Sequence, residues 1–578
     1  MAEHLYDIPM RQLPELVVDA PAARKARGAY FTPPALANFL ARWAVHGNRS
    51  ARVLDPTCGE GVFLLAAARE LRHLGTVEER LDDQVFGVDL HGESLEETTR
   101  LLEEEGLDAN VIASDFFELA PPSELFSSFG PFDAVIGNPP FVRYQQHVGQ
   151  ARRLSARAAL RQGVRLSGLA SSWAALPVHA GAFLVPEGRM AMVLPAELLT
   201  VGYAEPVRQW MRRRFASVKL VFFERRQFAD ALENVVLVLA QGSGGCDAFS
   251  LYYVHDGEDL NRIQPFDEYA VTLSDEGKWS DLLLSIRERQ VFKAVTHDHF
   301  VGLGDYGAPE LGTVTGANWF FTLNEATRKQ FGLQPDRHVD PICPPGTRHL
   351  RGLSFTQGDW DALRDAGEAV WILQPTVADR SAGLRRYLEV GESKGVPDAY
   401  KCQVRAVWWR PPVVARPDLF FTYMSHRYPR LISNTAGVTF VNSMHGVRLK
   451  PGMKIAKQAL PVLAMNSVTM LGAEIYGRSY GGGILKMEPR EAARLPLPAP
   501  KHLAVAWERL RRDRPKLEAE LRAGRWAGVV ERVDQVLLRE TLTLSAAEVG
   551  EITTALQTMR KRRMSRDPSV PASAVTGA

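Results

Sequence analysis

The feature that most constrains the fold is the alternation of short apolar runs with helical periods through the first 245 residues. Apolar residues at helical spacing predict helices over 32–45, 62–74 and 94–105. The runs expected to form strands lie at 51–55, 84–90, 111–115, 132–138, 189–195, 218–223 and 234–240. Strands that alternate with helices are typical of a mainly parallel sheet covered by helices on both faces. The fold class predicted is therefore α/β, and the last two runs lie close enough in sequence to form a hairpin.

The glycine-rich segment QGSGGCD at 241–247 marks a change of composition and predicts a domain boundary. We expect a first domain over 1–245 and a second domain of irregular strands, glycines, prolines and aromatic clusters over 246–500. Residues 501–563 are charged and predict a helical C-terminal segment. Residues 564–578 are small and polar, which predicts a disordered tail.

Composition excludes several classes of protein. Apolar residues make up 46% of the 578-residue chain, which supplies a sizeable core and excludes a largely disordered protein. Lys and Arg number 69 against 67 for Asp and Glu, so a nucleic-acid surface must come from local clusters. The four cysteines form no CxxC pair, and neither a signal peptide nor an apolar membrane span is evident. We therefore expect a soluble protein of the reducing cytoplasm that does not associate with membranes. No HExxH-type spacing occurs, so no metal is expected.

A glycine loop, DPTCGEG at 55–61, stands between a predicted strand and a predicted helix. Its glycines allow a tight turn and a close approach of backbone to ligand. Asp89 ends the next strand, where a carboxylate can hold the two hydroxyls of a ribose. The loop also begins with an acid, Asp55, which would repel a pyrophosphate but can pair with an ammonium group. The pattern favours a nucleoside that carries an amino acid, although the same residues also suit a generic strand–turn–helix.

The sequence Asn138-Pro139-Pro140-Phe141 follows another predicted strand, at the end where parallel α/β sheets place their ligands. The Asn138 side chain and the Pro139 backbone each offer a carbonyl oxygen, and the two prolines restrict the backbone. Two fixed acceptors can take both hydrogens of an exocyclic amine, and Phe141 can stack on a planar base. The alternative is an Asn-Pro turn that closes a buried strand, with Phe141 in the core.

In this order the motifs resemble those of the N6-adenine DNA methyltransferases of the gamma arrangement. GAYFTPP (28–34) resembles the N-terminal cofactor segment, LDPTCGEGVFL (54–64) the cofactor loop, and NPPFVRY (138–144) the catalytic motif. The resemblance implies a Rossmann-like, mainly parallel, seven-stranded methyltransferase sheet. It also implies a C-terminal mixed α/β target-recognition region with a helical tail. Phe141 replaces the commoner Tyr, which keeps the aromatic ring and loses a hydroxyl.

The resemblance also assigns roles to residues. Thr32 and Asp55 would contact the methionine moiety of S-adenosylmethionine, and Asp89 would hold its ribose. Asp115 and Phe116 would contact its adenine, although a helix cap is an alternative for Asp115. The cofactor loop would contribute Pro56, Cys58, Gly59 and Gly61, and the catalytic motif Asn138, Pro139, Pro140 and Phe141. Phe228 would stack on the target base together with Phe141, or else would be a core residue.

Two regions are candidates for DNA contact. Arg153, Arg157, Arg161 and Arg165 are spaced by four, so a helix would carry them as a basic stripe, which is also typical of a solvated face. TVTGANWFFTL (313–323) resembles the start of the family's recognition region, which makes Asn318 and Trp319 candidates. The basic cluster at 560–563 suits either DNA contact, packing against a partner or an exposed terminus.

The function expected is methyl transfer from S-adenosylmethionine to N6 of a flipped-out adenine in double-stranded DNA. It would serve a bacterial or archaeal restriction–modification or phage-defence system, with a separate restriction endonuclease or specificity subunit as a candidate partner. The alternatives are methylation of RNA or of a protein glutamine, and a combined methyltransferase–endonuclease. For the last of these, Glu392-Ser393-Lys394 has a carboxylate-x-Lys form but is expected in a loop.

Overall fold

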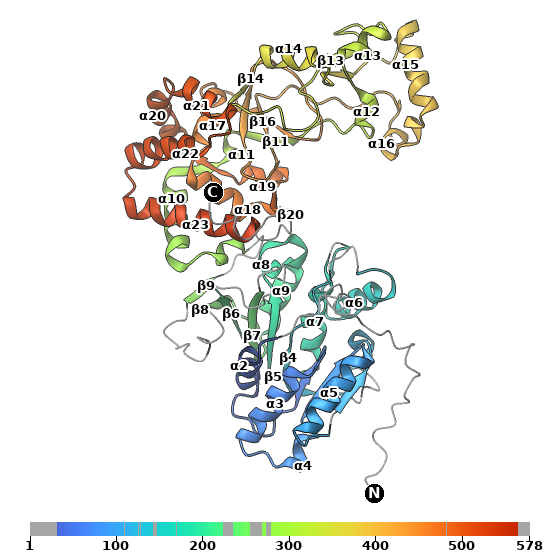
Figure 1. Ribbon diagram of the computed structural model, residues 1–578, viewed down its shortest axis with the longest axis vertical. Coiled ribbons are helices and arrows are strands. Elements are labelled where there is room, and N and C mark those ends of the chain that lie inside the picture. Colours follow the sequence, from blue (N-terminus) through green and yellow to red (C-terminus); the bar gives the residue numbers. More distant parts are fainter. Residues whose placement is uncertain are drawn as a thin grey trace. The chain divides into compact units, whose positions relative to one another are not determined.

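The computed structural model divides the chain into two compact units, Met1–Leu283 and Leu284–Ala578 (Figure 1). It describes residues 32–223, 235–254, 260, 269–272 and 279–564, apart from gaps at 109, 125–126, 128, 143–146, 169 and 481–482.

The first unit is built on one sheet with the strand order β3-β2-β1-β4-β5-β7-β6-β8-β9. β3, β2, β1, β4 and β5 are parallel, whereas β7 is antiparallel to both β5 and β6. The strands are β1 (Val53–Asp55), β2 (Val85–Asp89), β3 (Asn110–Ala113), β4 (Phe132–Gly137), β5 (Leu184–Pro195), β6 (Ser217–Phe223), β7 (Val235–Gln241), β8 (Ala248–Val254) and β9 (Tyr269–Thr272). All seven predicted strands and the β6–β7 hairpin are therefore confirmed.

Both faces of this sheet are buried, because successive side chains of each strand point to opposite sides. Ala134 and Ile136 of β4 join a core with the helices that precede β3, while Val135 joins a second core on the other face. The helices of the unit are α2 (Pro34–Val45), α3 (Val62–His73), α4 (Glu78–Leu81), α5 (Gly92–Glu104), α6 (Gly149–Arg161), α7 (Leu176–Ala180), α8 (Glu197–Thr200) and α9 (Glu205–Arg214). The predicted Rossmann-like α/β fold is confirmed.

The sheet continues beyond residue 245, where the composition places a domain boundary. β8 pairs in parallel with β6, and β9 pairs with β8, so nine strands replace the seven expected. The cause lies in β8: Phe249, Leu251 and Tyr252 are buried against the two cores of the first unit. The glycines at 242–245 thus form a turn between strands, not a linker between domains.

The described part of the second unit contains four small sheets. The largest has the order β11-β19-β16-β18-β14, and the others are β12-β15-β13, β17-β21-β20 and β10-β22. Their strands are β10 (Phe300–Gly302), β11 (Gly307–Leu311), β12 (Thr322–Leu323), β13 (Val339–Pro341), β14 (Ser354–Phe355), β15 (Trp371–Leu373), β16 (Leu419–Phe421), β17 (Met424–Ser425), β18 (Leu431–Asn434), β19 (His445–Leu449), β20 (Arg478–Tyr480), β21 (Ile484–Lys486) and β22 (Pro496–Pro498). The expected mixed α/β region is confirmed.

Helices flank these sheets, and a group of helices ends the described chain. They are α10 (Ile286–His299), α11 (Leu303–Tyr306), α12 (Asn318–Phe321), α13 (Glu325–Gln330), α14 (Gln357–Asp365), α15 (Ala382–Ser393), α16 (Tyr400–Gln403), α17 (Ala456–Leu463), α18 (Ser467–Tyr476), α19 (Pro489–Ala493), α20 (Pro500–Leu510), α21 (Arg514–Arg522), α22 (Ala527–Asp534) and α23 (Ala546–Met564). α20 to α23 confirm the predicted helical tail.

No single helix among the described residues is long and apolar enough to cross a membrane. Taken together, α17 and α18 are long and apolar enough to cross a membrane, but the two helices are bent by 82° relative to each other.

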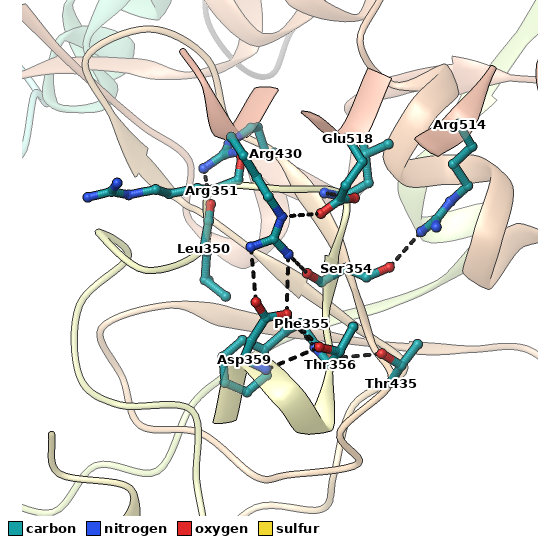
Figure 2. Close-up of polar contacts among 12 residues, drawn as sticks. Leu350, Arg351, Ser354, Phe355, Thr356, Asp359, Arg430, Thr435, Arg514 and Glu518 are labelled. Atoms are coloured by element: carbon teal, nitrogen blue, oxygen red, sulfur yellow. Dashed lines mark hydrogen bonds and ion pairs between the residues drawn. The ribbon is translucent and has the colours of Figure 1, made fainter. Parts of the chain in front are cut away.

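The helical tail is fastened to the sheets of the same unit by charged side chains (Figure 2). Glu518 of α21 accepts a hydrogen bond from the Leu353 backbone N–H at 2.7 Å, and Arg514 donates to the Ser354 hydroxyl at 2.5 Å. Glu518 approaches the backbone so closely that a Cβ at Gly352 would lie 1.8 Å from its Oε1. Glycine is therefore the residue that lets α21 dock beside β14.

Arg563 in the last turn of α23 forms a second attachment of the helical tail to the rest of the unit. Its guanidinium donates to both carboxylate oxygens of Glu474 on α18, at 2.8 to 3.1 Å, and to the His426 carbonyl at 3.0 Å. The Arg563 and Glu474 side chains are 3% and 2% exposed. Arg560 donates to the Tyr428 hydroxyl at 3.0 Å. The basic cluster at 560–563 was expected to contact DNA, to pack against a partner or to be exposed. For Arg563, exposure and DNA contact are wrong, because its charge is neutralised inside the unit.

Replacing Arg563 by Met should leave the buried Glu474 carboxylate without a counter-charge. Removal of one partner of a buried ion pair costs ~3–5 kcal/mol, so the free energy of unfolding should fall by that amount. Urea unfolding of the full chain, followed by circular dichroism, measures the change.

The double variant Arg563→Met/Glu474→Leu should recover most of the loss, because it removes both charges. Arg509→Met, which breaks a half-exposed pair with Glu540, is the matched control and should cost less than ~1 kcal/mol. A loss of similar size in Arg509→Met and Arg563→Met would contradict the assignment.

Candidate active site

The glycine loop joins the end of β1 to the start of α3. Gly59 and Gly61 have φ of +53° and +79°, and a Cβ on Gly61 would lie 2.9 Å from Cγ2 of Thr98. The Cys58 N–H donates to the Val88 carbonyl at 2.9 Å, which ties the loop to β2. The Thr98 hydroxyl donates to the Gly59 carbonyl at 2.6 Å. The loop therefore has one fixed shape, which is what a close approach to a ligand requires.

Asp89 lies at the end of β2, beside this loop. Its Oδ2 accepts a hydrogen bond from the Gly59 N–H and its Oδ1 from the His91 N–H, both at 2.9 Å. A carboxylate oxygen can accept more than one hydrogen bond, so each oxygen keeps a site for a ligand hydroxyl. Ribose binding by Asp89 stays a prediction, whereas its contact with the glycine loop was not predicted from the sequence.

Asp55 at the end of β1 is completely buried. Its Oδ1 accepts from the Thr57 N–H at 3.1 Å, whereas its Oδ2 is buried without a hydrogen-bond partner among the described residues. The Thr57 hydroxyl is also buried and unpaired within the described part of the chain. Burial, and to a smaller extent the nearby Asp89, raise the pKa of the Asp55 carboxyl to about 8. Such a group needs a cation or a donor to remain charged.

The NPPF segment, Asn138–Phe141, begins next to Asp55. Gly137 ends β4, and a Cβ on it would lie 2.9 Å from Oδ1 of Asp55, so glycine lets the two strand ends meet. The Asn138 amide nitrogen donates to the Thr32 hydroxyl at 3.2 Å. This bond directs the other end of the amide, Oδ1, which is buried and has no partner among the described residues. The structure thus brings Thr32, Asp55 and Asn138 together as expected, with Thr32 orienting the amide.

Ser172 is a residue of this site that the sequence analysis missed. Its hydroxyl donates to the Pro140 carbonyl at 2.5 Å and accepts from the Val142 N–H at 2.9 Å. Phe141, between them, is half-buried and packs on the core of the first unit. Ser172 lies 32 residues after Pro140, in a segment without a motif, so no sequence signal points to it.

Asp115 and Phe116 follow β3. Asp115 Oδ1 accepts a hydrogen bond from the Phe117 N–H at 3.0 Å and so caps a short 3₁₀ helix, η1 (Phe116–Glu118). The helix cap that the sequence analysis gave as the alternative role of Asp115 is therefore confirmed. Burial raises the pKa of the Asp115 carboxyl. Phe116 is 3% exposed and packs against His179 and Phe183. A ligand contact by Asp115 or Phe116 stays a prediction.

Several predicted residues lie outside the described residues. They are Phe228, the first part of the GAYFTPP segment and the end of NPPFVRY. Pro56 and Cys58 are buried at the base of the glycine loop, and burial raises the pKa of the Cys58 thiol well above its usual value.

The predicted arginine stripe is partly correct. Arg153, Arg157 and Arg161 are exposed on α6, which ends at Arg161, and Arg165 falls beyond the helix. The helix stops there because Gly163 adopts a left-handed conformation, with φ of +77°. Arg161 forms an ion pair with Glu124 at 3.3 Å. Within the described part of the chain, no ion pair involves Arg153 or Arg157.

The candidates in the second unit lie at one end of a helical turn, α12. Asn318 accepts a hydrogen bond from the Thr315 hydroxyl, so its side chain is already engaged. Trp319 is 59% exposed, and the Lys394 ammonium lies 5.3 Å from its ring centroid. The Glu392-Ser393-Lys394 segment ends helix α15, so its predicted loop conformation is wrong. The helix continues through Gly391, which packs against Phe320 and Trp408 too closely for a Cβ.

The arrangement in the first unit provides acceptors on neighbouring strand ends. Asp55 offers a site for a cation, Asp89 sites for hydroxyls, and Asn138 a directed carbonyl oxygen. Among the residues described, no three His, Cys, Asp or Glu side chains are grouped to hold a metal ion.

Two family models match the sequence. The N-6 DNA Methylase model matches residues 15–220, and the model of the C-terminal domain of the Type II methyltransferase M.Eco57I matches residues 276–538. M.AccI of Acinetobacter calcoaceticus is 20% identical over 480 residues, which are 81% of this chain and 84% of that protein. M.XamI of Xanthomonas campestris pv. amaranthicola is 23% identical over 486 residues, 82% of this chain and 86% of its own.

The fold is also similar to that of a solved structure. The Type IIL restriction-modification enzyme MmeI, in complex with DNA, has a TM-score of 0.51 and 13% identity, over 94% of this chain and 80% of its own. The order of the parallel strands, the glycine loop after β1 and the NPPF motif after β4 agree with the N-6 DNA Methylase match over residues 15–220. The two family matches and the named relatives together support an N6-adenine DNA methyltransferase of restriction–modification systems.

The two loop glycines should differ in their tolerance of alanine. Gly59→Ala meets no neighbouring atom and should cost only the left-handed backbone penalty, ~1–2 kcal/mol. Gly61→Ala also drives its Cβ against Thr98 and should cost ~1–3 kcal/mol more. Urea unfolding followed by tryptophan fluorescence compares the two, and equal losses would show that the contact with Thr98 does not restrict the loop.

Proposed function

We propose that this protein transfers a methyl group from S-adenosylmethionine to N6 of adenine in double-stranded DNA. The observation that carries the proposal is the Asn138 amide. Its nitrogen is held by Thr32, and its oxygen is buried and unpaired among the described residues, next to the strand end that carries Asp55. A directed acceptor without a donor suits an incoming amine.

The residues after β1 and β2 fit S-adenosylmethionine, which supplies a sulfonium methyl group when it is bound. The Asp55 Oδ2 and the Thr57 hydroxyl, which have no hydrogen-bond partner among the described residues, suit the ammonium and carboxylate of its methionine moiety. Asp89 retains acceptor sites for the ribose hydroxyls. Asp115 would accept from the adenine amine, with Phe116 nearby, and Gly59 and Gly61 leave room for the ligand. Pro56 and Cys58 would support the loop from below.

On the substrate side, the target adenine must leave the base stack before its amine is accessible. Asn138 Oδ1 and the Pro139 carbonyl would accept the two amine hydrogens, so that the nitrogen lone pair points towards the methyl group. Pro140 restricts the backbone, and Phe141 would stack on the base. Stacking contributes ~1–3 kcal/mol per base, which offsets part of the cost of flipping. Phe228 is proposed to cover the other face.

Adenine as the target follows from the family, because a cytosine amine suits the same two acceptors. DNA is favoured over RNA or protein because the two matched relatives are named Type II methyltransferases. The second unit would read the sequence, with Trp319 among its exposed residues, and Arg153 and Arg157 would contact phosphates. Cleavage by the same chain is not favoured, because Lys394 lies over the Trp319 ring. A separate endonuclease or specificity subunit would then act beside this protein.

The decisive test is methyl transfer to DNA from a methylation-deficient host, with the nucleosides analysed by mass spectrometry. The wild-type chain should produce N6-methyladenine. Asn138→Ala should produce none, since it removes the acceptor that orients the amine, while still binding S-adenosylmethionine. Methylated cytosine would correct the target base, and activity on RNA or protein alone would replace DNA as the substrate.

Affinity for S-adenosylmethionine should depend on pH through Asp55. Its carboxyl is protonated in the free protein below pH 8, so binding of an ammonium must release a proton. Affinity should therefore rise about tenfold per pH unit up to pH ~7.5, and fall above ~8 as the ligand α-amino group deprotonates. Isothermal titration calorimetry in two buffers of different ionisation enthalpy measures both affinity and proton release.

Asp55→Asn should bind more weakly and should lose the rise below pH 8, because an amide does not titrate. Asp133→Asn, a carboxylate near the start of β4 that accepts from the Arg52 N–H, is the matched control and should keep the wild-type profile. A pH-independent affinity in the wild type would exclude Asp55 as the ammonium partner.

A further inference from the structure

A second layer of polar side chains lies behind the catalytic motif, outside every role assigned above. It begins at Ser172, which forms three hydrogen bonds with the segment around Phe141. The hydroxyl donates to the Pro140 carbonyl at 2.5 Å and accepts from the Val142 N–H at 2.9 Å, and the Ser172 N–H donates to the Val142 carbonyl at 3.0 Å. These bonds stand on both sides of Phe141, so one residue fixes the backbone that carries the stacking ring.

The neighbours of Ser172 are themselves fixed by Tyr203. The Tyr203 hydroxyl lies 3.2 Å from Trp173 Nε1, 3.0 Å from the Ser171 hydroxyl and 2.5 Å from Glu197 Oε2. A phenol has one proton, and the short bond to a carboxylate is the one that takes it. The indole N–H and the Ser171 hydroxyl then donate to the two lone pairs of the Tyr203 oxygen.

This network connects two neighbouring strand ends. Glu197 opens α8, two residues after β5 ends at Pro195, and β5 pairs with β4, which delivers Asn138. Trp173 is 1% exposed in the core of the first unit, so its indole N–H has no access to water and depends on Tyr203. Burial and then the charge of Glu197 raise the pKa of the Tyr203 phenol, so it stays a donor at every pH of interest.

We infer that Ser172 and the Tyr203–Glu197 pair are positioning residues for the catalytic motif. Their role in this inference is to set the place of the Pro139–Phe141 backbone through the hydrogen bonds of Ser172 to Pro140 and Val142. This inference rests on the proposed function. A misplacement of ~1 Å in a catalytic group can cost ~10²-fold in rate, so loss of the network should act on turnover.

The cofactor residues provide an internal comparison. Asp55 and Asp89 are held by bonds to Thr57, Gly59 and His91, none of which joins the network. Loss of Ser172 should therefore leave the affinity for S-adenosylmethionine unchanged while it slows methyl transfer.

The experiment compares Ser172→Ala and Tyr203→Phe with the wild-type chain. We expect kcat to fall 10–100-fold, the Kd for S-adenosylmethionine to stay within twofold, and the fluorescence rise of 2-aminopurine placed at the target base to be smaller. Ser172→Thr keeps the hydroxyl and should restore most of kcat. Ser127→Ala, which removes a comparable hydroxyl bond to the Ala120 carbonyl in the same unit, is the matched control and should keep wild-type kcat.

Each outcome decides the inference. Wild-type kcat in Ser172→Ala, or an equal loss of kcat and cofactor affinity, would overturn it, since the residue would then be dispensable or merely structural. Hydrogen–deuterium exchange adds a measurement that does not require turnover. The peptide covering residues 138–142 should exchange faster in Ser172→Ala than in Ser127→Ala. If the wild type methylates no DNA, the proposed function fails, and unchanged exchange would separately overturn the role of the network.

Discussion

The candidate site of the first unit depends on the contact between the ends of β1 and β4. Asp55 is buried, and one of its carboxyl oxygens has no hydrogen-bond partner among the described residues; Gly137 is the residue that lets the second strand approach it. A buried carboxyl without a partner opposes folding, so the surrounding sheet must supply the stability that keeps it in place. It does so with two cores, one on each face of nine strands. Burial of the Asp55 carboxyl therefore lowers the stability of the unit locally, and the apolar cores of the sheet offset this loss. A ligand cation beside Asp55 would remove part of it.

Much of this unit was predictable because its signals are local. Apolar runs predict strands, and the glycine loop and NPPF can be recognised from their residue types and from their place after a strand. What the sequence did not reveal depends on distant partners. Ser172 resembles any other serine until the fold places it against Pro140 and Val142. β8 follows a glycine-rich turn that looked like a domain boundary, and only its pairing with β6 shows that the sheet continues.

In the second unit, the surroundings of charged residues could likewise not be predicted from the sequence. Arg563 belongs to a run of basic residues that suggested a surface, yet it lies inside the unit because Glu474 and three backbone carbonyls accept its hydrogen bonds. Similarly, Glu518 holds the β14 segment through a backbone N–H at Leu353, in a space that exists only because residue 352 is glycine. Composition cannot distinguish such buried ion pairs from solvated ones, since the difference lies in the neighbours and not in the residue.

The Arg563–Glu474 pair has a consequence for folding while the chain is being synthesised. Glu474 leaves the ribosome well before Arg563, so during synthesis its carboxylate has no counter-charge and the segment around α18 cannot settle in its final place. The buried ion pair of the second unit is therefore completed by a residue in the last turn of α23. A nascent chain that stopped short of that arginine would carry every catalytic motif of the first unit and still lack a finished partner unit, which would make interrupted copies targets for degradation.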